Sequence, residues 1–104
     1  MDNIDRLIKE CYWDYHMTKD DVIKIAKGDD MYMKKHLFGK IIDNSTEKSR
    51  NLLALFSKYD LYILFNEFKI PSFNPKKVEK TLAILKYIIF NDNNEIRKYK
   101  IWKN

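Results

Sequence analysis

The chain has 104 residues, a mass of 12.6 kDa and a formal net charge of +5, which fits a single domain over residues 1–104. Apolar residues make up 45% and charged residues 34%, a globular balance that argues against a disordered chain. No apolar run approaches the ~20 residues of a membrane span, so we expect no membrane partner. Asp2, Asp5 and Arg6 interrupt the start, so we expect no signal peptide.

Two glycines, two prolines and apolar spacings of three or four residues predict an all-α fold. We expect a compact bundle of five or six short helices with a short C-terminal basic-aromatic tail. The first helix is predicted over residues 3–10. Residues 11–16, Cys-Tyr-Trp-Asp-Tyr-His, follow as an aromatic connector whose rings we expect to pack onto the core.

Thr18 is a predicted helix start, because Asp21 lies three residues on, as in a capping box. We expect Gly28 to end this helix in the left-handed conformation of a C-terminal cap. Asp29 or Asp30 begins the third helix, which stops near residue 44. The expected apolar faces of these two helices are Val22, Ile23, Ile25 and Ala26, and Met33, Leu37, Phe38, Ile41 and Ile42.

The segment 46–68 is predicted to form two helices, because Ser57 and Asp60 can cap a break. Ser45 or Thr46 starts the first of them, with Leu52, Leu53, Leu55 and Phe56 as its apolar face. Residues 69–75 form a loop, and Asn74 followed by Pro75 starts a last helix over 75–90. The tail over 95–104 is either a short docked helix or an arm that orders on binding.

Charge is uneven along the chain, and lysine outnumbers arginine 17 to 3. Residues 1–30 have a net charge of −3 and residues 31–104 a net charge of +8. This asymmetry either guides a polar partner into one orientation or is an incidental surface imbalance. A protein that reads bases favours arginine, so the lysine excess looks more like solvated surface.

No catalytic, cofactor-binding or metal site is predicted, and we expect the protein not to be an enzyme. Cys11 is the only cysteine, which favours the cytoplasm, and its apolar neighbours indicate a buried, inert thiol. His16 and His36 do not have a zinc spacing. Two isolated glycines do not make a phosphate loop, and the carboxylate pairs at 20–21 and 29–30 fit helix starts.

Nucleic-acid binding is a possible alternative. Residues 18–42 resemble a helix-turn-helix, but their turn favours an ordinary helical hairpin. A basic module would use lysines of this hairpin and of the last helix together with the tail. The lysines of this module are Lys34, Lys35, Lys76, Lys77 and Lys80. In the helix-turn-helix interpretation, the candidate base-reading residues of the second helix are Lys34, Lys35, His36 and Lys40.

The tail combines aromatic and basic side chains, which would stack on nucleotides, anchor in a partner's groove, or fold back onto the last helix. The candidate partner-binding residues of the chain are Trp13, Tyr15, Arg97, Lys98, Tyr99, Lys100, Trp102 and Lys103.

The order of elements resembles that of small helical proteins encoded beside AbiEii-type nucleotidyltransferase toxins in bacteria and archaea. The resemblance covers residues 11–90 and rests on Tyr-Trp-Asp-Tyr at 12–15, the segments 18–25, 28–30, 37–44 and 55–61, and the turn 71–75. It implies an antitoxin-like or accessory partner of a nucleotidyltransferase. The sequence therefore predicts an interaction protein, with a nucleic-acid-binding module or a homo-oligomeric structural protein as alternatives.

Overall fold

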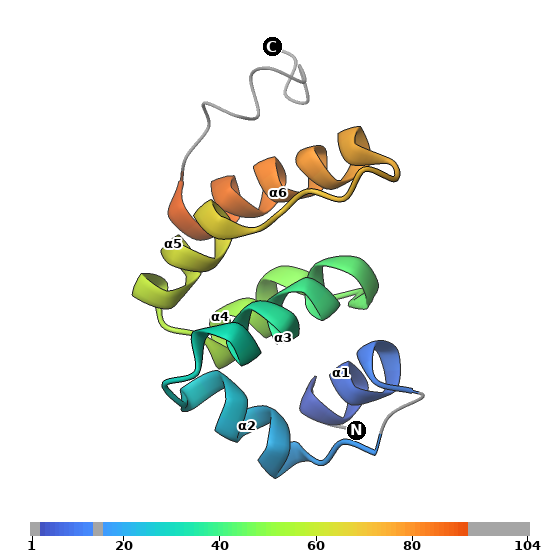
Figure 1. Ribbon diagram of the computed structural model, residues 1–104, viewed down its shortest axis with the longest axis vertical. Coiled ribbons are helices and arrows are strands. Elements are labelled where there is room, and N and C mark those ends of the chain that lie inside the picture. Colours follow the sequence, from blue (N-terminus) through green and yellow to red (C-terminus); the bar gives the residue numbers. More distant parts are fainter. Residues whose placement is uncertain (1–2, 14–15, 92–104) are drawn as a thin grey trace. The chain divides into compact units, whose positions relative to one another are not determined.

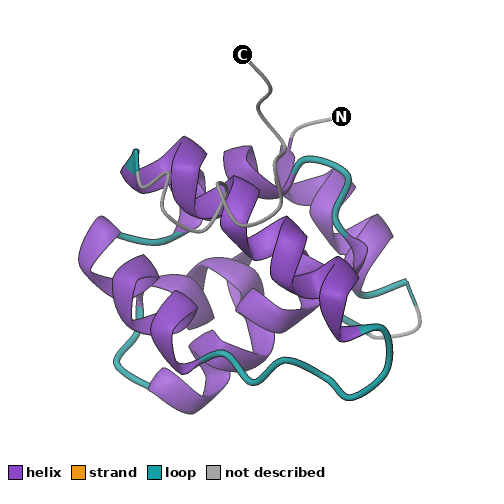
Figure 2. Cartoon of the chain, turned by 90° about the horizontal axis from the view of Figure 1, so that it is seen from above, coloured by secondary structure: helices purple, strands orange, loops and turns teal. Residues whose placement is uncertain are grey.

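The structure, a computed structural model, describes residues 3–13 and 16–91. Every regular element in this part of the chain is a helix, which confirms the all-α prediction (Figure 2). The chain divides into an N-terminal unit, residues 1–68, and a C-terminal unit, residues 69–104 (Figure 1). The expectation of one domain stays a prediction. The helices among residues 3–13 and 16–91 are α1 (Asn3–Cys11), α2 (Lys19–Lys27), α3 (Met31–Asn44), α4 (Lys48–Leu55), α5 (Lys58–Glu67) and α6 (Pro75–Phe90).

In the N-terminal unit, α3 is the central helix and contacts α1, α2, α4 and α5. Phe38 of α3 is buried, and its ring meets those of Phe65 and Phe68 edge to face, with centroids 5.0 and 5.5 Å away. Fully buried aliphatic side chains from all five helices complete the core of this unit: Leu7, Val22, Leu37, Ile41, Leu52, Leu61 and Leu64. Burial of these side chains from water is the main force that holds the unit together.

Side-chain caps begin α2, α3 and α5, whereas the residues before α4 and α6, Glu47 and Asn74, make no side-chain cap hydrogen bond. The Thr18 hydroxyl accepts from the Asp21 N–H at 3.1 Å, and the Asp21 carboxylate accepts from the Thr18 N–H at 3.0 Å, so the predicted capping box is confirmed. Asp30 caps α3 by accepting from the N–H of Met33. Ser57 caps α5, and the break before it confirms the prediction of two helices in the segment 46–68. The prediction that Ser45 or Thr46 starts the first of them is wrong, because α4 begins at Lys48 and Glu47 precedes it.

Gly28 ends α2 as predicted, but the prediction of a left-handed conformation is wrong. Its φ is −81° and its ψ is −171°, an extended conformation open to any residue. The position requires glycine because it has no room for a side chain. A Cβ atom placed there would lie 2.7 Å from the backbone oxygen of Lys24. The residue is required by a close approach of backbone to backbone.

Four side chains that apolar spacing predicts on buried faces are exposed, which corrects the predicted core. They are Ile23, Met33, Leu53 and Ile88, one each on α2, α3, α4 and α6. An apolar stripe read from sequence is wider than the strip of helix that neighbours cover, so residues at its border face water. Exposed apolar side chains scattered singly in this way are common on folded proteins.

The C-terminal unit begins with a loop over residues 69–74 and continues into α6. Pro75 occupies the first turn of the helix, as predicted, and Asn74 precedes it in a left-handed conformation with φ of 55°. Asn91 closes the helix in the same conformation, and its N–H donates to the Tyr87 carbonyl oxygen at 2.9 Å. None of the helices formed by the described residues is long and apolar enough to cross a membrane.

Candidate functional site

Trp13 lies two residues after the end of α1, and it is the one predicted partner-binding residue among those that the structure describes. It is 79% exposed, whereas the preceding Tyr12 is buried. The Tyr12 N–H donates to the Ile8 carbonyl oxygen at 2.8 Å, and the Lys40 ammonium lies 5.7 Å from the centre of the Tyr12 ring. These contacts hold Tyr12 within the N-terminal unit, whereas the Trp13 side chain is exposed to solvent.

The expectation that the aromatic connector packs onto the core is therefore right for Tyr12 and wrong for Trp13. Consecutive side chains of a turn point in different directions, so only one of the two enters the core. The other candidate partner-binding residues lie outside the described residues: Tyr15, Arg97, Lys98, Tyr99, Lys100, Trp102 and Lys103.

Cys11 is buried at the end of α1, as predicted. Burial away from water raises the pKa of its thiol to about 11, and the nearby Glu10 carboxylate acts in the same direction. The thiol is therefore protonated at neutral pH and is a poor nucleophile. His16 and His36 are both exposed. Among residues 3–13 and 16–91 there is no group of three or more His, Cys, Asp or Glu side chains that could hold a metal ion.

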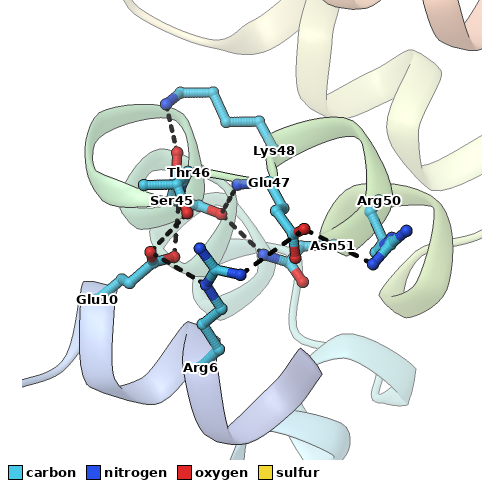
Figure 3. Close-up of polar contacts among 8 residues, drawn as sticks. All are labelled: Arg6, Glu10, Ser45, Thr46, Glu47, Lys48, Arg50 and Asn51. Carbon is cyan, nitrogen blue, oxygen red and sulfur yellow. Dashed lines mark hydrogen bonds and ion pairs between the residues drawn. The ribbon is translucent and has the colours of Figure 1, made fainter. Parts of the chain in front are cut away.

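A polar cluster that sequence reasoning missed joins α1 to the start of α4 (Figure 3). The Glu10 carboxylate accepts from the backbone N–H of Thr46 at 3.1 Å and from its hydroxyl at 2.6 Å. Arg6, one turn earlier on α1, pairs with Glu10 at 3.6 Å and with Glu47 at 3.8 Å. The hydrogen bond from the Thr46 hydroxyl, aided by Arg6, lowers the pKa of Glu10.

The inner half of this cluster is centred on Ser45, which is buried. Its hydroxyl oxygen accepts from the Asn51 side-chain amide at 2.7 Å and from the Glu47 N–H at 3.2 Å, while Lys48 donates to its carbonyl oxygen (Figure 3). Both groups at the hydroxyl oxygen are donors, so neither can take its proton and activate it for catalysis. The cluster thus ties α1 to the start of α4.

Lys34 differs most from its predicted role. It was a candidate for nucleic-acid contact, but it is buried, and its ammonium donates to the Asp60 carboxylate at 2.7 Å. The helical spacing carried a signal for this burial, since Lys34 lies three and four residues before the buried Leu37 and Phe38. Asp60, 26 residues away, was predicted only as part of a helix cap.

The other two lysines of α3 also have partners within the N-terminal unit. Lys35 pairs with Glu67 of α5 at 2.5 Å, and Lys40 lies by the Tyr12 ring. Of the four candidate base-reading residues of α3, these two and Lys34 therefore have partners inside the protein. This finding favours the predicted ordinary hairpin over a DNA-reading helix-turn-helix.

Exposed aromatic rings occur elsewhere in the N-terminal unit. Tyr32 lies at the start of α3, and Tyr59 and Tyr62 lie on one face of α5. Sequence reasoning did not single out these residues, since an exposed tyrosine and a buried one have the same local pattern. Comparisons of the chain with protein-family models, with curated proteins and with solved structures find no match.

Proposed function

We propose that this protein is a non-catalytic interaction protein and that its partner is another protein. The observation that carries the proposal is Trp13, a large aromatic ring in solvent next to a buried, hydrogen-bonded Tyr12. Tryptophan is among the residues that most often dominate binding energy at protein interfaces. Tryptophan also has only two rotatable side-chain bonds, so it loses little conformational entropy when a partner covers it.

The size of the ring is sufficient for such a role. Burying an indole removes about 200 Å² from water, which corresponds to about 5 kcal/mol of gross stabilisation before the entropic costs of association. A partner with an apolar pocket for Trp13 and a polar rim would fit this surface.

The resemblance to proteins encoded beside AbiEii-type nucleotidyltransferases supports one class of partner. The proposal is that the protein binds such a nucleotidyltransferase in the cytoplasm and covers part of its surface, in the manner of an antitoxin. The single cysteine supports this compartment, because Cys11 is buried and unpaired and the chain has no second cysteine for an intrachain disulfide.

Gel filtration with light scattering tests the proposal. The protein is mixed at micromolar concentration with the AbiEii-type nucleotidyltransferase of the same genome, and a complex of the summed mass is expected. No complex at these concentrations would contradict the assignment of the partner. A stable homodimer that the Trp13→Ala variant dissociates would instead support the homo-oligomeric alternative and overturn the proposal.

A further inference from the structure

Charge divides between the two units of the chain. The N-terminal unit has eleven Lys and Arg residues against twelve carboxylates, whereas the C-terminal unit has nine against three. The described part of the C-terminal unit, residues 69–91, has five lysines and one carboxylate, Glu79. Four of these lysines are exposed and lie in the loop or in the first two turns of α6: Lys69, Lys76, Lys77 and Lys80.

This concentration of positive charge indicates a polyanionic partner. The C-terminal unit has eight lysines and a single arginine, Arg97. Arginine is the residue that reads base edges with paired hydrogen bonds, whereas lysine contacts phosphate as a point charge. The composition therefore favours contact with a phosphate backbone over reading of a base sequence.

Phe73 favours single-stranded over double-stranded nucleic acid as the ligand. It is 85% exposed, and it lies between Lys69 and Lys76 in the sequence, in the loop before α6, where Pro71 restricts the backbone. An exposed aromatic ring among lysines can stack on an unpaired base while the lysines neutralise the neighbouring phosphates. A duplex keeps its bases stacked inside and offers no such face.

We infer that the C-terminal unit binds single-stranded nucleic acid without strong sequence preference. Lys69, Lys76, Lys77 and Lys80 contact phosphates, and Phe73 stacks on a base. This activity lies beyond the proposed protein–protein function and uses other residues, so either can fail while the other holds.

Fluorescence anisotropy with a labelled 20-nucleotide oligothymidylate, titrated between 50 and 200 mM salt, tests the inference. The variant with Lys76→Gln, Lys77→Gln and Lys80→Gln is compared with a control that changes Lys24, Lys27 and Lys58 to Gln. Both variants lose three exposed positive charges, but the control loses them from the N-terminal unit. Circular dichroism should show that both variants are folded. In the first variant the lost lysines lie near the N-terminus of α6, where the helix dipole is positive, so their removal should not destabilise this helix.

Lys76, Lys77 and Lys80 would make three of the proposed phosphate contacts. Three contacts contribute about −2 to the slope of log affinity against log salt concentration, which corresponds to about a 20-fold fall in wild-type affinity between 50 and 200 mM salt. The first variant should lose that dependence and bind at least ten-fold more weakly at 50 mM salt, while the control should change less than two-fold. No binding at 50 mM salt, or equal losses in both variants, would overturn the inference.

The Phe73→Ala variant tests stacking. It should weaken oligothymidylate binding about ten-fold, within the range measured for one stacked base, and leave the salt slope unchanged. An unchanged affinity would overturn the stacking role. A duplex of the same length should bind more weakly than the single strand, and equal or tighter duplex binding would overturn the single-strand preference. Phosphatidylserine vesicles form the last arm, and binding to them without binding to the oligonucleotide would assign the surface to membranes instead.

Discussion

Lys34 and Asp60 form an ion pair that joins the central helix α3 to α5, with 2.7 Å between the ammonium nitrogen and the carboxylate oxygen. Their side chains are 8% and 18% exposed, so the pair is largely withdrawn from water. Removal of one partner from a buried pair leaves the other charge unpaired, which costs more than the loss of an exposed pair.

We therefore expect Lys34→Met to lower the free energy of unfolding by about 2 kcal/mol, measured by urea denaturation. Lys35→Met is the matched control, because Lys35 pairs with Glu67 on the same two helices but both side chains are exposed. Its effect should stay within about 0.5 kcal/mol. Equal losses of unfolding free energy in the two variants would contradict the claim that the buried pair contributes more to stability than the exposed pair.

Glu10 should make stability depend on pH in the acid range. Its pKa is lowered from 4.5 in the folded protein, so its stabilising contribution is complete above that value and is lost as the pH falls through the folded pKa. Urea denaturation between pH 5.5 and pH 3 should show the wild type losing stability faster than the Glu10→Gln variant. Identical pH profiles would contradict the role assigned to the Thr46 hydrogen bonds.

The two glycines should respond in opposite ways to alanine. Gly28→Ala places a Cβ atom 2.7 Å from the Lys24 carbonyl oxygen, so we expect a loss of about 1–2 kcal/mol. Gly39→Ala brings the Cβ to an ordinary 3.6 Å from the Phe68 ring, within α3. The better helix propensity of alanine should then stabilise the protein by about 0.5–1 kcal/mol. Thermal unfolding of both variants checks the order, and a stabilising Gly28→Ala would refute the close approach.

Cys11 should react with a disulfide reagent only when the protein unfolds. The thiol is buried and its pKa is raised to about 11, so little thiolate exists at neutral pH. Absorbance of released thionitrobenzoate should rise slowly in native buffer and within seconds in 6 M guanidinium chloride. Rapid reaction in native buffer would show that the end of α1 opens readily.

Local signals predicted much of the fold. The caps at Thr18 and Ser57 are visible in sequence because each hydrogen bond spans only three residues. The same reasoning placed Cys11 in the core from its apolar neighbours. Periodicity predicted the helices well and their borders less well, as the exposed Met33 shows.

Contacts between distant segments could not be predicted in this way. The Glu10–Thr46 bonds span 36 residues and the Lys34–Asp60 pair spans 26, and neither has a local pattern. The sequence also does not decide which of Tyr12 and Trp13 enters the core, since both are aromatic and adjacent. The direction of the chain after α1 decides it, and that direction depends on tertiary packing.

The most direct test of the proposed function is a calorimetric titration of the AbiEii-type nucleotidyltransferase with Trp13→Ala and with Tyr59→Ala. Both residues are exposed aromatics of the N-terminal unit, at 79% and 74%, so the two truncations are matched in kind. If Trp13 anchors the complex, its removal should weaken the Kd about 30-fold or more, while Tyr59→Ala should change it less than three-fold. Equal affinities of the Trp13→Ala variant and the wild type would contradict the account.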